Sequence, residues 1–152
     1  MVNSENQSPS KRRRWLSVSV ALVSMTLVSI YPFETTVVPA WTLKVVDEHG
    51  NLVRGAFVRE LWQHDSIESK SHEQDSSTDQ DGYVTFPSRT IKASLLSRMF
   101  GPVVNFITEG IHAGYGPHAH VLALERGAEG WADYTPGQPP PEQIVVRARH
   151  SG

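Results

Sequence analysis

Hydrophobic and polar residues alternate in short stretches from Trp41 to near the C-terminus, with turn-forming residues between the stretches. Alternation with a period of two places the apolar side chains on one face of a β-strand. Strands are predicted on this basis over residues 41–47, 55–62, 83–86, 102–108, 119–125 and 143–149. Because short strands at this spacing are typical of a sandwich, residues 41–152 are predicted to form a mainly β domain.

The last stretch shows the clearest alternation. Ile144, Val146 and Ala148 are expected to face the core, and Arg147 is expected to face solvent. The stretch over residues 55–62 is less regular, because Glu60 falls in phase with the apolar residues that are expected to point inward.

Three segments of the domain do not alternate. Residues 64–80 are polar throughout, and residues 127–141 hold three glycines and four prolines, so both are predicted to be exposed loops. Residues 88–100 are ambiguous: their apolar residues lie at helical spacing, although the first half is also compatible with a strand. The sequence therefore leaves helix and strand open for this segment.

The N-terminal part has a different pattern. A basic cluster at residues 11–14 precedes a largely apolar, uncharged segment at residues 15–33. This order is the layout of an export signal or a signal-anchor helix. We therefore expect residues 1–14 to stay in the cytosol, residues 15–33 to enter a membrane as a helix, and the C-terminal domain to lie on the extracytoplasmic side.

Two fates of the hydrophobic segment remain open. Its apolar run, Leu16–Tyr31, is shorter than the roughly 20 residues that span a bilayer and longer than the h-region of about 7–15 residues in a cleaved signal. Val38-Pro39-Ala40 has the small-x-small pattern of a cleavage site after Ala40, with residues 34–40 as a linker. The alternative is retention of residues 15–33 as a membrane anchor, which we prefer.

Composition excludes several classes of protein. The 152 residues are enough for one domain, and the net charge of −2 argues against a nucleic acid partner bound through bulk charge. The chain has no cysteine, which excludes disulfide frameworks, thiolate zinc sites, cysteine nucleophiles and a lipid-modified cysteine. No cofactor is predicted.

The turns between the first three predicted strands carry a family resemblance. The residues that carry it are Val45-Val46-Asp47, Gly50, Gly55-Ala56, Val58, Thr78-Asp79, Asp81-Gly82 and Phe86-Pro87. On these motifs residues 41–87 resemble the carboxypeptidase regulatory-like domain, including members found in bacterial envelope proteins. The resemblance implies an immunoglobulin-like or transthyretin-like antiparallel β-sandwich and is nearly silent on function.

Three histidines near the start of a predicted strand are candidate metal ligands. His118 and His120 would project from the same side of the strand, and His112 precedes them in a glycine-rich segment. Imidazoles placed this way can bind zinc or copper, so a metal-binding domain or a metal-dependent enzyme is one alternative. The other interpretation, which we favour, is a solvated loop that leads into a strand.

Two aromatic residues of the glycine- and proline-rich segment are candidates for a binding surface. Trp131 and Tyr134 have the side chains that bind sugars or peptides when they are exposed. The sequence thus predicts a membrane-targeted, extracytoplasmic and non-enzymatic interaction or accessory module. Its partner would be an envelope protein or, as a further alternative, a glycan bound by these aromatic residues.

Overall fold

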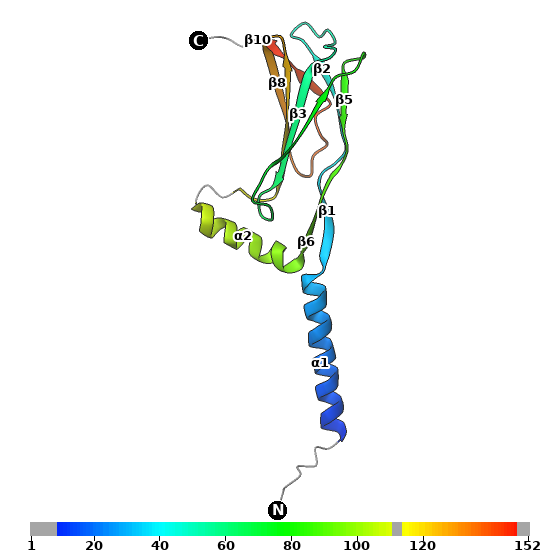
Figure 1. Ribbon diagram of the computed structural model, residues 1–152, viewed down its shortest axis with the longest axis vertical. Helices are drawn as coiled ribbons and strands as arrows, with labels where there is room; N and C mark the ends of the chain where they lie inside the picture. Colours follow the sequence, from blue (N-terminus) through cyan, green and yellow to red (C-terminus); the bar gives the residue numbers. More distant parts are fainter. Residues whose placement is uncertain (1–8, 111–113, 149–152) are drawn as a thin grey trace, which may run out of the picture.

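The computed structural model describes residues 9–110 and 114–148, which form a long N-terminal helix, a β domain and a second helix at the base of that domain (Figure 1). The two helices are α1 (Pro9–Ile30) and α2 (Leu95–Glu109). The strands are β1 (Pro32–Val38), β2 (Trp41–Val46), β3 (Phe57–His64), β4 (His72–Ser77), β5 (Tyr83–Phe86), β6 (Arg89–Ser94), β7 (Pro117–Glu125), β8 (Ala128–Tyr134), β9 (Gln143–Val145) and β10 (Arg147–Ala148).

Two sheets make up the body of the domain. The larger has the strand order β10-β8-β7-β3-β4 with antiparallel pairs, and the smaller has the order β5-β2-β9, in which β2 and β9 run parallel. Both sheets contribute side chains to one hydrophobic core, which includes Trp41, Leu43, Val45, Val58, Phe86, Val121 and Ile144. The prediction of a mainly β, sandwich-like domain with antiparallel sheets is confirmed.

Strands β1 and β6 form a two-stranded antiparallel ribbon that connects the sandwich to α1 (Figure 1). Its register runs from the pair Pro32 and Ser94, next to the helices, to the sandwich, where Val37 and Val38 are buried in the core. The expected linker at residues 34–40 is therefore wrong. Four consecutive β-branched residues before Pro39 favour a strand, and β6 supplies the partner for it.

The ambiguous segment divides into two elements. Its first half is β6, and the helix α2 begins at Leu95 behind Ser94, whose side chain accepts a hydrogen bond from the backbone N–H of Ser97 as an N-cap. The strand predicted over residues 102–108 is wrong, because this segment is the second half of α2. Its β-branched residues imitated a strand pattern, but its polar residues repeat at helical spacing.

Both predicted loops contain a strand. Residues 64–80 include β4, an edge strand whose polar side chains are mostly exposed and whose pairing with β3 needs only backbone groups. Residues 127–141 include β8, in which Gly130 and Ala132 are buried against the core side of the sheet. The loop interpretation was wrong for these parts, since composition alone does not reveal an edge strand or a strand with small inward residues.

The C-terminal stretch confirms two of its three inward residues. Ile144 and Val146 are buried and Arg147 is exposed, as predicted, but Ala148 is exposed. The chain leaves the smaller sheet after β9 and joins the larger sheet as β10. Because the chain changes sheets at Val146, the inward and outward alternation of side chains does not continue into β10, and Ala148 does not point into the core.

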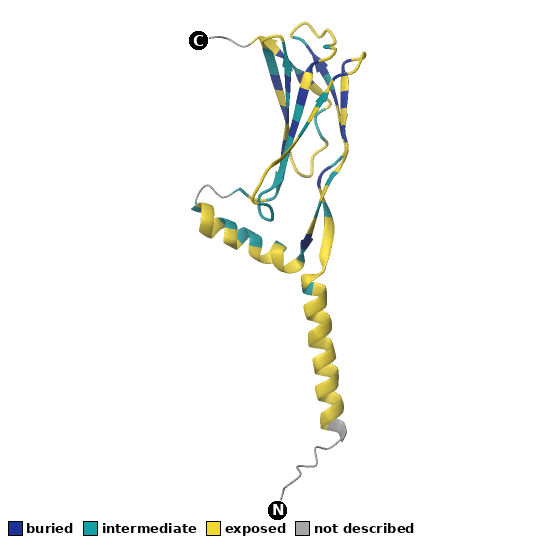
Figure 2. Ribbon diagram, in the orientation of Figure 1, coloured by how far each residue is buried: buried dark blue, intermediate teal, exposed yellow. Residues whose placement is uncertain are grey.

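The hydrophobic N-terminal segment forms the predicted helix. The part of α1 from Lys11 to Ile30 is long and apolar enough to cross a membrane, and none of it is buried. Figure 2 shows the contrast: buried residues are concentrated in the sandwich and the upper ribbon, whereas α1 is exposed along almost its whole length.

Candidate functional site

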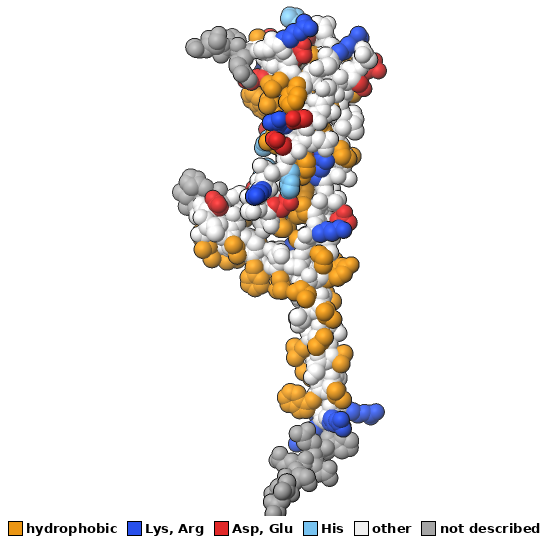
Figure 3. Space-filling view, in the orientation of Figure 1, with side chains coloured by type: hydrophobic (Ala, Val, Ile, Leu, Met, Phe, Trp, Pro, Cys, Tyr) orange, Lys and Arg blue, Asp and Glu red, His pale blue; other side chains and the backbone are white. Residues whose placement is uncertain are grey.

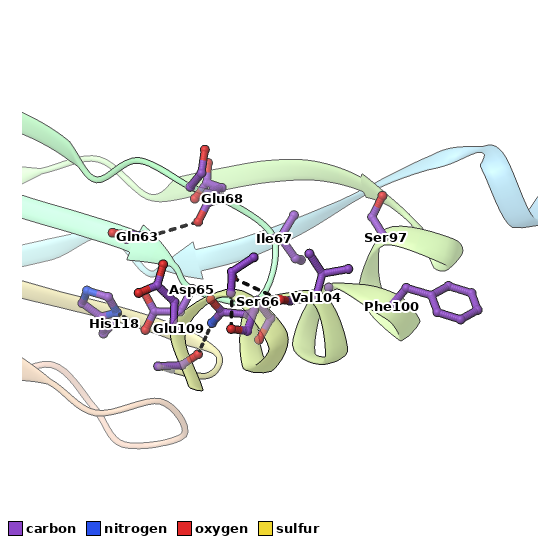
Figure 4. Close-up of a pocket in the computed structure, with 15 residues that line it drawn as sticks. Gln63, Asp65, Ser66, Ile67, Glu68, Ser97, Phe100, Val104, Glu109 and His118 are labelled. Atoms are coloured by element: carbon purple, nitrogen blue, oxygen red, sulfur yellow. Dashed lines mark hydrogen bonds and ion pairs between the residues drawn. The ribbon is translucent and has the colours of Figure 1, made fainter. Parts of the chain in front are cut away.

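A cleft of about 820 Å³ separates α2 from the base of the sandwich (Figure 4). The loop between β3 and β4 forms one wall, and the side of α2 that carries its polar residues, together with Phe100 and Val104, forms the other. His118 at the start of β7 lies at one end. Three carboxylates line it, those of Asp65, Glu68 and Glu109. With His118 they place four titratable side chains around one concave surface.

The sequence of α2 dictates how the helix faces the cleft. Ser97, Gly101, Asn105 and Thr108 repeat at helical spacing and line the cleft. The Asn105 side chain donates a hydrogen bond of 2.7 Å to the carbonyl oxygen of Gly114. Gly101 lies so close to the loop that a Cβ atom there would collide with the carbonyl oxygen of Ser66. The polar face of α2 is therefore fixed against the sandwich.

His118 and His120 lie on the same face of β7, as the period of two predicted. Their rings stack with centroids 6.0 Å apart and an interplanar angle of 18°. The Nδ1 atom of His118 lies 3.1 Å from a carboxylate oxygen of Asp65, a partner that the sequence analysis did not identify. The third candidate, His112, lies outside the described residues. Asp65 belongs to a segment predicted as loop, and nothing in its local sequence marks it as a histidine partner.

His118 and His120 are not part of a larger cluster of potential metal-ligand side chains among the described residues. Within residues 9–110 and 114–148, no group of three His, Asp or Glu side chains lies close enough to hold a metal ion. The nearly parallel stacking of the rings also directs their nitrogen lone pairs along two separate planes. The described histidines therefore do not converge on a common point.

Several polar groups of the cleft are hydrogen-bonded to residues that border it. Ser66 Oγ accepts a hydrogen bond from the backbone N–H of Gly116, and the hydroxyl of Ser97 bonds that of Ser94 at 3.0 Å. Glu68 accepts from the backbone N–H of His64 and pairs with a ring nitrogen of His72 at 3.0 Å. These bonds fix the conformation of the loop and of the N-terminus of α2 beside the cleft.

Trp131 and Tyr134, the predicted binding aromatics, lie on opposite faces of β8. Trp131 is 68% exposed, whereas Tyr134 is partly buried with its ring 6.3 Å from that of Trp41. Residues three apart in a strand point to opposite sides of the sheet, so they cannot form one platform. Trp131 alone remains a surface candidate. It borders a second cleft of about 730 Å³, which also includes Glu48, Glu129, Gln143 and Arg147.

A buried ion pair joins the ribbon to the sandwich. Glu60 on β3 is fully buried, and its Oε2 accepts a 2.9 Å hydrogen bond from Nε of Arg89 at the start of β6. The guanidinium of Arg89 stacks on Trp62 at 4.1 Å and also donates to the side chain of Gln74. Burial raises the pKa of Glu60, and the contact with Arg89 opposes that rise. The inward phase of Glu60 was the only sequence signal of this cluster.

Comparison with protein-family models and with curated proteins finds no match to this chain. The arrangement of its own residues is therefore the basis on which its function is inferred.

Proposed function

We propose that the protein is a single-pass, membrane-anchored interaction module that presents its β-sandwich on the extracytoplasmic side and acts by binding rather than by catalysis. The observation that carries this proposal is the continuity of α1 with β1. The helix ends at Ile30, the strand begins at Pro32, and the strand enters the core of the sandwich.

This continuity favours retention of the helix over its removal. Cleavage after Ala40 would detach β1, and with it Val37 and Val38, which are 1% and 0% exposed in the core. It would also leave β6 without its hydrogen-bonding partner. A removable signal is not expected to supply a strand to the mature domain, so α1 fits the role of a permanent anchor.

The ends of α1 fit the two surfaces of a bilayer. Its 22 residues are about 33 Å long, and the uncharged part after Arg14 accounts for about 24 Å, so that the basic residues lie at the edge of a hydrocarbon region about 30 Å thick. The basic residues 11–14 lie at one end, as is typical of the cytosolic side. Tyr31 and Phe33 pack edge to face at the other end, with centroids 5.2 Å apart, where interfacial aromatic residues are common.

The binding role is supported by the surface around Trp131. Tryptophan and arginine are among the residues most enriched where proteins bind partners. Trp131 and Arg147 border the same cleft, and β10, which carries Arg147, lies at the end of the domain opposite α1 (Figure 1). The proposed partner is another envelope protein, with a glycan as the alternative.

The anchoring is tested by labelling and by mass. Because the chain has no cysteine, Arg54→Cys and Arg12→Cys each give a single thiol, one in the domain and one before the membrane-spanning part of the chain. In intact cells a membrane-impermeant maleimide should label the Arg54→Cys variant and not the Arg12→Cys variant, and the protein in the washed membranes should keep its full mass. Labelling of the Arg12→Cys variant alone, or a mass that corresponds to a start at Trp41, would contradict the proposal.

The role of β1 is tested by two truncated chains. A chain that begins at Pro32 keeps the strand, and a chain that begins at Trp41 matches the product of cleavage after Ala40. Loss of two fully buried valines and of the strand pairing should destabilise the shorter chain by roughly 4 kcal/mol relative to the longer one in urea unfolding. Equal stabilities would mean that the sandwich does not need β1.

A further inference from the structure

Helix α2 carries an apolar face that no described residue buries. None of the residues of α2 is buried, and Met99 and Ile107 are 68% and 75% exposed. The exposed large apolar side chains on this face are Leu95, Leu96, Met99, Val103, Phe106 and Ile107, while the exposed side chains of Phe100 and Val104 border the cleft. A contiguous apolar patch of this kind is unusual on a protein surface that faces only water.

The contacts of the opposite face fix the rotation of α2. Gly101 lies directly against Ser66, and Asn105 is bonded to Gly114, so this side of the helix faces the sandwich. Residues such as Val103 and Ile107, which lie around the helix from these positions, must point away from the domain. The opposite face of α2 already packs against the sandwich, and this packing directs the apolar face away from the domain.

The ribbon places α2 where the membrane helix ends. Ser94, the N-cap of α2, is the register partner of Pro32, which follows the end of α1 at Ile30 by two positions. Arg98 strengthens this connection, because its guanidinium donates to the carbonyl oxygen of Phe33 at 2.9 Å and to that of Ala93 at 3.3 Å. The start of α2 thus lies at the end of α1 that is nearest the domain.

The two apolar surfaces are continuous. In Figure 1, α2 extends sideways from the junction, across the direction of α1 and along the base of the domain. Figure 3 shows hydrophobic side chains along the underside of α2, on the side from which α1 leaves, and further hydrophobic side chains along α1. A bilayer crossed by α1 would therefore meet the apolar face of α2 at its surface.

We infer that α2 lies flat on the extracytoplasmic surface of the membrane that α1 crosses, and that it inserts its apolar face among the lipid headgroups and the upper acyl chains. This inference rests on the proposed anchoring by α1. Amphipathic helices bind in this way with the apolar face about 5–10 Å deep in the interface. The second contact would fix the orientation of the sandwich relative to the membrane, which a single helix cannot do.

The charge of α2 indicates the lipid chemistry involved. The helix carries one basic residue, Arg98, and one acidic residue, Glu109, and Arg98 is held by backbone carbonyls. Electrostatic attraction to anionic lipids is therefore small, and the apolar side chains supply the binding. We expect insertion into zwitterionic as well as anionic membranes.

The test uses the full-length chain reconstituted in phosphatidylcholine vesicles, with a single spin-labelled cysteine at one of four positions. Ile107→Cys reports on the apolar face of α2, and its neighbour Thr108→Cys, on the face that lines the cleft, is the matched control. Val23→Cys reports on the middle of α1, and Arg54→Cys reports on the exposed domain surface. Relaxation of the label by oxygen and by a water-soluble nickel chelate measures its depth in the bilayer.

The inference predicts that the label at residue 107 is more accessible to oxygen than to nickel and lies at a shallower depth than the label at residue 23. The labels at residues 108 and 54 should be accessible to nickel. If the label at 107 matches that at 54 while the label at 23 is deep, α1 is an anchor but α2 does not touch the membrane. If the label at 23 is accessible to nickel, the proposed anchoring itself fails.

Two further results would also overturn the inference. Dipolar broadening between labels at residue 107 of different molecules would mean that a second copy of the chain covers the apolar face. Protection of residue 107 from both relaxants, without such broadening, would mean that another part of the protein covers it. Repeating the measurement in phosphatidylglycerol vesicles checks the charge argument, because the depth at residue 107 should stay nearly the same.

Discussion

The sandwich and the two helices place the same kinds of residue in opposite environments. Val121 in β7 is completely buried, whereas Ile107 in α2 is 75% exposed. In the strands the apolar residues repeat every two positions and meet another sheet, so that the protein supplies their non-aqueous surroundings. In α1 and α2 no described part of the protein supplies them, which is why we assign those surroundings to a membrane.

The largest difference between the sandwich and the helices is expected in the free energy of unfolding when a charged residue is placed in each of them. Val146→Asp puts a carboxylate at a position that is 3% exposed, and it should cost more than about 4 kcal/mol because the charge has no partner there. Ile107→Asp changes an exposed position and should alter the stability of the sandwich by less than about 0.5 kcal/mol. Urea unfolding in detergent, followed by near-ultraviolet circular dichroism, measures both.

Arg147→Asp is the control for the register of the C-terminal strands. Arg147 is adjacent to Val146 and exposed, so its substitution should have a small effect. Similar losses for residues 146 and 147 would show that the strand is misassigned. A large loss of stability for Ile107→Asp would instead show that α2 packs into the folded domain, and the contrast between the regions would disappear.

The next largest effect is expected at the junction between the regions. Glu60→Leu removes one partner of the buried ion pair and leaves the Arg89 guanidinium without its carboxylate, which should cost about 3 kcal/mol. The double variant with Arg89→Met removes both charges and should recover much of that loss. If the double variant is no more stable than Glu60→Leu, the ion pair is not the link that holds the ribbon on the sandwich.

The sequence was sufficient for the parts of the fold in which local pattern and environment agree. The alternation predicted strands where β2, β3, β5 and β7 lie, and the basic and apolar N-terminal segments predicted α1. It was insufficient where tertiary context decides. Edge strand β4 has no apolar face, and the apolar residues of α2 resemble a strand unless its polar residues are read at helical spacing.

The candidate sites divide in the same way. The common face of His118 and His120 followed from the strand period alone. The pairing of His118 with Asp65 and that of Glu60 with Arg89 join segments far apart in the chain, so their identification needs the three-dimensional arrangement. The separation of Trp131 from Tyr134 was hidden because their segment had been assigned to a loop and not to a strand.

A smaller change in stability is expected from pH, and it also tests the Glu60–Arg89 pair that joins the ribbon to the sandwich. Burial raises the pKa of Glu60 above its usual value of 4.5, so its contribution to stability is greatest below that pH and is lost as the pH rises through the raised pKa. Relative to the Glu60→Gln variant, the native protein should therefore become less stable as the pH rises above about 4.5. A difference between the two proteins that does not change with pH would mean that Glu60 is not perturbed.

Two other carboxylates, those of Asp47 and Asp75, affect stability at lower pH and with the opposite sign. Hydrogen bonds from Asn51 and Arg59 hold the pKa values of Asp47 and Asp75, respectively, below their usual 3.8. Their stabilisation is present above that pH and is lost as the pH falls through the lowered pKa. Comparison with Glu60→Gln cancels these contributions, because both proteins carry the same two aspartates.

The smallest effect is expected from zinc, which should leave the melting temperature of the native protein unchanged. A zinc–imidazole bond of about 2.0–2.1 Å lies in the plane of the ring, and the rings of His118 and His120 stack 6.0 Å apart with an angle of only 18° between them. A metal ion in the plane of one ring would therefore lie outside the plane of the other ring. Binding would therefore require the rings to turn and His118 to leave Asp65.

The matched variants are His120→Ala, which keeps the contact between His118 and Asp65, and the double variant His118→Ala with His120→Ala. Thermal unfolding with excess zinc and with a chelator should give one curve for each protein. A zinc-dependent rise in melting temperature that is lost in both variants and weakens below about pH 6 would show that neutral imidazoles bind the metal. That result would favour a metal site over the proposed binding module, and it would make His112 the first residue to substitute next.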